Sequence, residues 1–162
     1  MHETADDLAA LQDLLDRSYA AAGEHLLRIH TPERRLGAPQ LAERLTGMCL
    51  LSLATVTADG RPIAGPVDGI FFRGAFHFGS SPDSVRFRHI DARPHVSATY
   101  LPGEELAVTV HGRAVPIDIL SESAGLQQAY RDVYGPDWGH LAEQGARYAR
   151  IEADRMFTFH MA

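Results

Sequence analysis

The middle of the chain consists of short apolar runs that are separated by tight turns. Residues 50–56 form an apolar run with a β-branched end and the length of a buried strand. The pair 59–60 is Asp-Gly, which favours a turn because Gly tolerates positive φ and Asp can bond to its own backbone. Residues 63–72 resume the apolar pattern, 73–74 form a second turn, and 75–78 return. This pattern predicts three consecutive antiparallel strands.

The rest of the chain adds further strands and places helices on either side of them. Strands are predicted at 96–101 and 105–116, and as a last pair at 148–153 and 155–160 around Asp154. Helices are predicted where apolar residues recur at helical spacing or where caps and glycines bound a segment, at 4–30, 39–45, 82–91, 121–135 and 137–145. The strands therefore form the centre of the molecule, and the helices cover its ends.

This order of elements predicts an α+β domain built on a small β-barrel. A parallel α/β fold would need a helix after nearly every strand, and the strand-rich centre contains one. No Gly-x-Gly-x-x-Gly follows a predicted strand, which argues against a Rossmann fold. We expect a single domain over residues 1–162, with an N-terminal helical extension at about 1–47.

Composition narrows the expected partners and compartment. The net charge of −6 disfavours nucleic acid or a membrane surface as the main partner. The single cysteine, Cys49, cannot form an intrachain disulfide, so the cytoplasm is the expected location. The sequence shows no signal peptide, and its apolar runs are too short to span a bilayer. The nine histidines show no ligand spacing, so we expect no metal site.

Residues 79–86, Gly-Ser-Ser-Pro-Asp-Ser-Val-Arg, have the composition of an anion site. The hydroxyl donors of this loop are Ser80, Ser81 and Ser84. Pro82 suits the first turn of a helix, whose positive end would then face the serines. Arg86, one turn further on, would add a charge-assisted bond to a phosphate. The alternative interpretation is an ordinary Ser-Pro helix cap followed by a solvated arginine.

The chain from about residue 40 to 118 resembles the FMN-binding split barrel, the superfamily of pyridoxamine 5′-phosphate oxidase and the flavin and deazaflavin oxidoreductases. The residues that carry the resemblance, in order, are Leu-Ala-Thr-Val at 53–56, Asp-Gly-Arg-Pro at 59–62, Pro66, Val67, Phe78, Ser80, Ser84, Arg86, Ile90, Pro94 and Val96. The resemblance implies a six-stranded antiparallel split β-barrel with flanking helices.

The resemblance also assigns a phosphate site to the serine-rich loop. Ser80, Ser84 and Arg86 keep the hydroxyl and cationic positions of the family's phosphate signature, and Ser81 lies in the same loop. Two cations of the family's pattern are absent. Val85 stands where the signature has an arginine, and Gly65 matches an arginine on the preceding strand. Help from Arg61, Arg88 or a second subunit would compensate.

By the same resemblance, Val67, Asp68 and Gly69 lie along the isoalloxazine ring, with their backbone at the ring edge. The Asp68 carboxylate would accept a hydrogen bond from the pyrimidine part of a flavin, or it is simply an exposed strand residue. In this family the cofactor sits in a cleft between two protomers, so the resemblance implies a homodimer.

The implied function is an FMN-dependent oxidoreductase that acts on a small molecule, with no catalytic side chain identified because the cofactor supplies the chemistry. Residues 155–160 lack the Arg/Trp pattern of true pyridoxamine phosphate oxidases, so that reaction is not expected. One alternative cofactor is the deazaflavin coenzyme F-420, for which Arg86, Arg88 and Arg93 would begin a basic groove. Haem binding, or cofactor binding without turnover, is the alternative from another class. Tyr134 and Trp138 either stack on a ligand or belong to the core.

Overall fold

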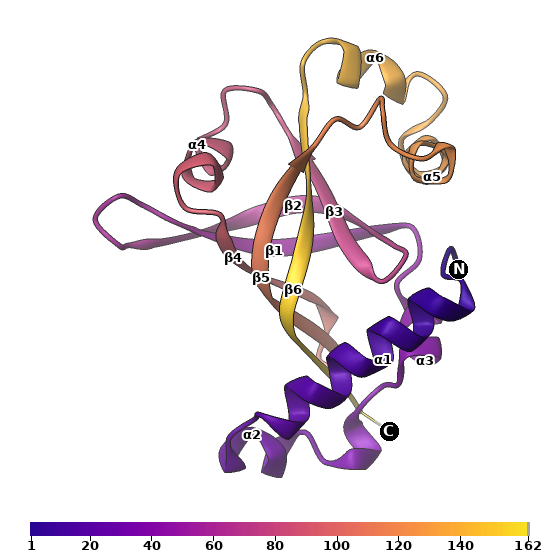
Figure 1. Ribbon diagram of the computed structural model, residues 1–162, viewed down its shortest axis with the longest axis vertical. Coiled ribbons are helices and arrows are strands. Elements are labelled where there is room, and N and C mark those ends of the chain that lie inside the picture. The colour runs from indigo at the N-terminus through magenta and orange to yellow at the C-terminus, as the bar shows by residue number, and fades with distance from the viewer. Residues whose placement is uncertain (162) are drawn as a thin grey trace.

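The computed structural model describes residues 1–161 and contains a closed barrel of six antiparallel strands (Figure 1). Around the barrel the strands follow the order β1-β2-β3-β6-β5-β4. Their bounds are β1 Met48–Val56, β2 Pro62–Phe72, β3 Ala75–Ser80, β4 His95–Gly103, β5 Leu106–Ile117 and β6 Arg147–His160. The predicted α+β class and the six-stranded antiparallel split barrel are both confirmed.

Helices lie at the two ends of the barrel and beside it (Figure 1). Their bounds are α1 Ala5–Ala20, α2 Glu24–Ile29, the 3-10 helix η1 Pro32–Arg34, α3 Ala38–Arg44, α4 Val85–Ala92, α5 Ala124–Tyr134 and α6 Trp138–Glu143. The first three α-helices gather at one end, whereas α5 and α6 lie together at the other. Within residues 1–161, no helix has the length and apolarity that a membrane crossing requires.

Along the barrel strands, buried side chains that fill the interior alternate with side chains on the outer surface. In β1 the side chains of Cys49, Leu51 and Leu53 are buried, whereas those of the alternate positions Met48 and Leu50 are exposed. This period of two is the geometry of a strand with one buried face. The apolar run predicted as a buried strand is therefore buried on one face only.

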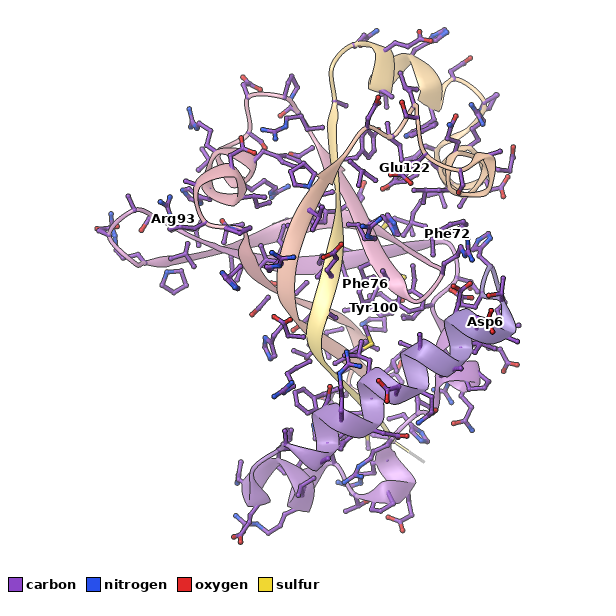
Figure 2. All side chains as sticks on the ribbon, in the orientation of Figure 1. Asp6, Phe72, Phe76, Arg93, Tyr100 and Glu122 are labelled. Carbon is purple, nitrogen blue, oxygen red and sulfur yellow. The ribbon has the colours of Figure 1, made fainter. Side chains whose placement is uncertain are left out.

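A second, smaller core lies outside the barrel, between its wall and the helices α5 and α6. Val67 and Phe71 of β2 point into the barrel, whereas Ile70 and Phe72 belong to this outer core. Its buried members are Ile70, Phe72, Ile119, Leu126, Ala129, Tyr130, Trp138, Ala142 and Tyr148. Figure 2 labels Phe76, which belongs to the barrel core, and Phe72, which belongs to the outer one.

The N-terminal helices are fastened to β6 by buried polar contacts. The Tyr19 hydroxyl donates to the Thr158 carbonyl at 2.7 Å and accepts from the Thr158 amide at 2.9 Å. The single helix predicted over residues 4–30 is wrong, because α1 ends at Ala20 and α2 begins anew after Gly23, its N-cap. The break lets the chain turn while α1 continues to pack on β6.

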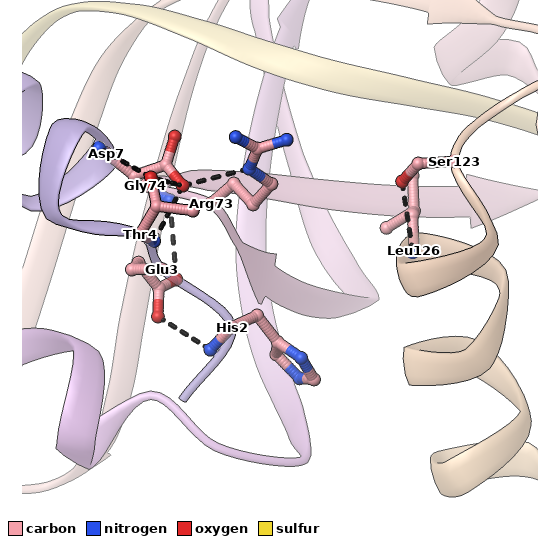
Figure 3. A network of polar contacts seen from close by, with 8 residues as sticks. All are labelled: His2, Glu3, Thr4, Asp7, Arg73, Gly74, Ser123 and Leu126. Atoms are coloured by element: carbon pink, nitrogen blue, oxygen red, sulfur yellow. Dashed lines mark hydrogen bonds and ion pairs between the residues drawn. The ribbon is translucent and has the colours of Figure 1, made fainter.

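The start of α1 also binds the turn between β2 and β3 (Figure 3). The Arg73 Nε donates to the Asp7 carboxylate at 2.9 Å, and the Gly74 amide donates to Glu3 at 3.4 Å. The turn needs positive φ at both of its residues, 50° at Arg73 and 81° at Gly74. The N-terminal segment thus holds a tight hairpin turn from outside.

The last strand differs from its prediction. Residues 148–153 and 155–160 belong to one strand, β6, and not to a pair of strands. The register against β5 shifts by one residue, since His111 pairs with Arg155 and Gly112 pairs with Ala153. Asp154 is the extra residue of a β-bulge, which bends the strand without ending it.

Candidate functional site

The serine-rich loop connects β3 to α4, and α4 begins later in the chain than predicted. The helix starts at Val85, with Ser84 as its N-cap, so Pro82 lies in the preceding turn. The Ser84 hydroxyl accepts a hydrogen bond from the Phe87 amide at 3.4 Å. The cap satisfies one free amide of the first turn and places this hydroxyl at the positive end of an eight-residue helix.

Arg86 joins α4 to β2 at the place where the resemblance leaves a cation missing. Its Nη2 donates to the Pro66 carbonyl at 2.9 Å. A Cβ built on Gly65 would lie 3.5 Å from the same nitrogen. The guanidinium of Arg86 therefore lies beside Gly65, where the family pattern has an arginine side chain.

A groove of about 230 Å³ lies between α4 and the first half of β2; we call it the α4 groove. It is lined by Leu53, Thr55, Ile63, Ala64, Gly65, Ser80, Ser84, Val85, Arg86 and His89. Three predicted site residues, Ser80, Ser84 and Arg86, come together here. His89, which the sequence interpretation did not assign to the site, also lines the groove, and its Nδ1 lies 2.9 Å from the Thr55 Oγ1.

A second cavity of about 390 Å³ adjoins the α4 groove at Ser80, and we call it the aromatic cavity. It is lined by Asp68, Gly79, Ser80, Ser81, Pro82, Tyr130, Tyr134, Trp138, Leu141, Gln144, Ala146 and Tyr148. The cavity is the open end of the outer core, where the packing of α5 and α6 against the barrel stops. Of the predicted site residues, it contains Asp68, Ser80 and Ser81.

Stacked aromatic rings form one wall of this cavity. The Tyr130 ring is stacked with Trp138 at 5.0 Å between centroids and with Tyr134 at 6.1 Å. Tyr148 meets Tyr130 edge-on at 5.2 Å and accepts a hydrogen bond from the Trp138 Nε1 at 3.0 Å. Three elements, α5, α6 and β6, therefore contribute rings to one packed aromatic cluster.

Gly79 makes room for this wall. It pairs with Tyr148 across β3 and β6, and a Cβ on Gly79 would lie 2.6 Å from the Tyr148 Cε1. The Tyr148 ring therefore rests directly on the backbone of β3.

Charge and burial raise the pKa values of the tyrosines that line the cavity. Burial, together with the nearby Asp68 carboxylate, raises the pKa of Tyr134. Burial also raises the pKa of Tyr130 and of Tyr148. The raised pKa values keep all three phenols protonated well above neutral pH.

The remaining predicted site residues divide between the barrel and the surface. Val67 is buried in the barrel interior, and a Cβ on Gly69 would lie 2.7 Å from the Leu51 Cδ1, also inside. Only their backbone is available to a ligand on the outer face. Asp68, between them, points outward and lines the aromatic cavity.

The basic groove suggested for a deazaflavin is not assembled by the described residues. Arg93 lies beyond the end of α4 (labelled in Figure 2) and donates to the Val56 carbonyl at 2.9 Å. Arg88 is exposed and lines neither the groove nor the cavity. Among residues 1–161, no three His, Cys, Asp or Glu side chains form a group that could hold a metal ion.

The sequence interpretation named Tyr134 and Trp138 but missed Tyr130 and Tyr148, which also line the cavity. Tyr130 and Tyr134 are four residues apart and share one face of α5, a spacing visible in the sequence. Tyr148 had no such signal, since only the pairing of β3 with β6 brings it onto Gly79. Trp138 belongs to the buried core, as one of its two interpretations predicts, and it also lines the cavity, so stacking on a ligand stays a prediction.

Several solved structures share this fold at low sequence identity. HutZ, a haem storage protein from Vibrio cholerae, has a TM-score of 0.60 and 19% identity, covering 75% of this chain and 92% of that one. An FAD-binding protein from Mesorhizobium loti has a TM-score of 0.56 and 18% identity, covering 80% of this chain and 98% of that one. An F420 reductase has a TM-score of 0.55 and 16% identity, covering 70% of this chain and 93% of that one. A search of curated protein sequences finds no match.

A comparison with protein-family models is more specific than these structural similarities. The model of the family described as pyridoxamine 5′-phosphate oxidase matches residues 38–158, from the start of α3 to near the end of β6. The match includes β1 to β5, β6 as far as Thr158, the α4 groove and the aromatic cavity. This chain therefore belongs to the pyridoxamine 5′-phosphate oxidase family.

Proposed function

We propose that this protein is an oxidoreductase that binds FMN, with the phosphate in the α4 groove and the ring beside β2. The family includes oxidoreductases. The observation that carries the proposal is the convergence of Ser80, Ser84 and Arg86 on one groove at the start of α4. Two hydroxyls, a guanidinium and the positive end of a helix are the donors that a phosphate requires.

The donor set fits a phosphate although it contains fewer cations than the family pattern. Arg86 uses one nitrogen on the Pro66 carbonyl, and this bond fixes the guanidinium at the rim of the groove. A planar guanidinium has further donors in a fixed fork, so one arginine can serve both partners. His89 supplies an additional polar side chain in the same groove.

Bound FMN would accept and return a pair of electrons as hydride, and the chain would hold and orient it. The backbone of Val67, Asp68 and Gly69 would meet the ring edge. The Asp68 carboxylate would accept a hydrogen bond from the ring. The aromatic cavity, which adjoins the groove at Ser80, would receive the small-molecule reactant and keep water from it. Because residues 155–160 lack the Arg/Trp pattern, pyridoxamine phosphate is not the proposed reactant.

We also propose a homodimer in which a second copy closes the groove. About 230 Å³ is less than the ~300–1,000 Å³ typical of sites that enclose a ligand. The outer faces of the paired strands β1 and β4 carry exposed apolar side chains, with Leu50 exposed by 53% and Leu101 by 62%. A second copy would cover these side chains. Sedimentation should give twice the mass of the chain, whereas a monomer that retains cofactor would contradict the dimer.

The first experiment is the absorption spectrum of the purified protein, followed by titration with FMN, coenzyme F-420 and haemin. Flavin bands and saturable FMN binding are the expected result. A single near-violet band with F-420 binding would favour the deazaflavin alternative, which the low-identity likeness to an F420 reductase keeps open. A Soret band would favour haem, which HutZ is described as storing.

The second experiment removes the proposed phosphate donors. Each charge-assisted hydrogen bond contributes about 1.5–3 kcal/mol, so Ser84→Ala with Arg86→Ala should weaken FMN binding at least tenfold. Arg88→Ala, on the exposed side of the same helix, is the matched control and should leave FMN affinity unchanged. Circular dichroism checks that α4 is intact, because Ser84 is its cap. Equal FMN affinity in the double variant and the control would refute the site.

A further inference from the structure

The aromatic cavity contains an unusual polar feature that the proposed FMN site does not use. Tyr130 lines the cavity and is 2% exposed, yet within residues 1–161 its hydroxyl has no hydrogen-bond partner. Buried hydroxyls are normally bonded, because desolvation without a partner is costly. The Tyr130 oxygen is itself buried, so a molecule in the cavity would reach it only if the Tyr130 ring moved.

The cavity has a negative electrostatic character. Asp68 is the only charged residue among those that line it, and no ion pair within residues 1–161 involves its carboxylate. Tyr134 is the last residue of α5, so the negative end of that helix lies at the same place. Arg131 lies 5.7 Å from the Trp138 ring centroid and does not line the cavity. Arg147, which pairs with Ser80 across β3 and β6, is also not a lining residue and forms an ion pair with Asp91 at 2.7 Å.

We propose that the aromatic cavity binds a planar aromatic molecule that carries a protonated nitrogen. The Tyr134 ring, which is stacked with Tyr130 and exposed at the cavity, provides a face for the aromatic part, and the Asp68 carboxylate provides the partner for the cation. Identifying this molecule as the reactant rests on the proposed function, whereas the binding itself does not.

The chemistry of the lining supports this class of ligand in three ways. Aromatic faces attract both flat rings and cations, because their π-systems carry negative charge at the face. The volume of about 390 Å³ lies within the range of small-molecule sites. The hydroxyls of Ser80 and Ser81 at the border with the α4 groove can orient a polar substituent.

The same lining disfavours anionic ligands. A carboxylate or phosphate in the cavity would face Asp68 and the end of α5, with no arginine or histidine among the described lining residues to offset the repulsion. The two adjoining sites are therefore complementary, one built for an anion and the other for a cation. Ser80 is common to both.

Three naphthalene derivatives of matched size test the inference: 2-naphthylmethylamine, 2-naphthylmethanol and 2-naphthoate. Dissociation constants are measured at pH 7.5 by isothermal titration calorimetry on the full chain, without added FMN. The amine should bind at least fivefold more tightly than naphthoate, with the alcohol between them. Equal or tighter binding of naphthoate would overturn the inference.

Paired variants locate the effect in the cavity. Asp68→Asn should bring the ratio of amine to naphthoate affinity below twofold and leave the alcohol unchanged. Asp132→Asn removes the same charge from an exposed position of α5 outside the cavity and should leave the ratio as in the wild type. Leu141→Arg, at an exposed lining position, should reverse the preference. An unchanged ratio in Asp68→Asn would place the probe elsewhere and refute the assignment.

A repeat with saturating FMN separates this inference from the proposed function. Selective amine binding in a protein that binds no FMN would leave the inference standing and refute the proposed function. Tight FMN binding in a protein that shows no preference among the naphthalenes without FMN would do the reverse.

Discussion

The barrel interior and the outer core under α5 and α6 are built from different aromatic residues. The fully enclosed aromatic rings of the barrel are phenylalanines, namely Phe71, Phe76, Phe78 and Phe87. The outer core instead uses Tyr130, Trp138 and Tyr148 beside Phe72. Phenylalanine has no polar atom to satisfy, so it suits a space closed on every side, whereas Tyr and Trp need a partner or a ligand.

This difference separates stability from function in one small domain. The barrel is closed by six paired strands, and its core has no open end. The outer core depends on α5 and on α6, a helix of six residues, and it opens into the aromatic cavity. We therefore expect the barrel to set global stability and the outer core to set binding.

The largest expected effect tests which core controls folding. Phe78→Ala should lower the free energy of unfolding by about 3–5 kcal/mol, because Phe78 is fully buried and leaves a cavity inside the barrel. Trp138→Ala should cost less in global unfolding, since α5 and α6 can open locally while the barrel remains folded. Urea denaturation followed by circular dichroism measures both. A larger loss for Trp138→Ala would reverse the proposed division.

The next effect concerns acid stability at the outer face of β3. Burial lowers the pKa of His77 from 6.5 to about 4, with Arg150 nearby disfavouring the cation further. The folded state thus holds His77 neutral while the unfolded chain takes up a proton. Its contribution is complete above pH 6.5 and is lost as the pH falls toward 4, by up to about 3 kcal/mol.

The variant His77→Gln has no titrating group at this position, so its comparison with the wild type separates the contribution of His77 from those of other groups. Glu122, Asp7 and Arg73 line the same recess as His77, so the wild-type curve also contains their contributions. The expected result is that the stability difference between wild type and variant shrinks between pH 7 and pH 4. A constant difference over that range would show that His77 is not held neutral by the fold.

A smaller effect probes the contact between the barrel wall and the cavity. Gly79→Ala should lower the free energy of unfolding by about 1–3 kcal/mol, because the new Cβ displaces the Tyr148 ring. It should also weaken binding of 2-naphthylmethylamine. Gly139→Ala, in α6 with no atom within 4 Å of its added Cβ, is the matched control and should be neutral or stabilising. Equal behaviour of the two variants would contradict the close packing of Tyr148.

The smallest effect concerns one hydrogen bond in the outer core. Tyr148→Phe removes the acceptor of the Trp138 Nε1 and should cost about 1 kcal/mol, since it leaves a buried donor unpaired. Tyr134→Phe, whose hydroxyl is at the cavity and not in this bond, should cost less. Thermal unfolding measures both, and a stable Tyr148→Phe protein with unchanged midpoint would show that the bond contributes nothing.

Local signals in the sequence determined the strands, the turns and the fold class. Apolar runs and the Asp59-Gly60 and Arg73-Gly74 turns were sufficient for a small antiparallel β-barrel, whereas the number of six strands came from the family resemblance. They act between neighbours in the chain, so they can be read without the fold. The break at Ala20, the late start of α4 and the continuous β6 were missed, because caps and bulges depend on what the segment packs against.

The tertiary structure alone decided how the candidate sites are assembled. Tyr148 lies on Gly79 only because β6 pairs with β3, 69 positions apart in the paired residues. Arg86 fills the space beside Gly65 only because α4 packs against β1 and places the Arg86 side chain within reach of the Pro66 carbonyl of β2. Contacts between distant segments arise from strand pairing and helix packing, which one local pattern does not contain. The residue types therefore indicated an anion site, and the packing created the aromatic cavity beside it.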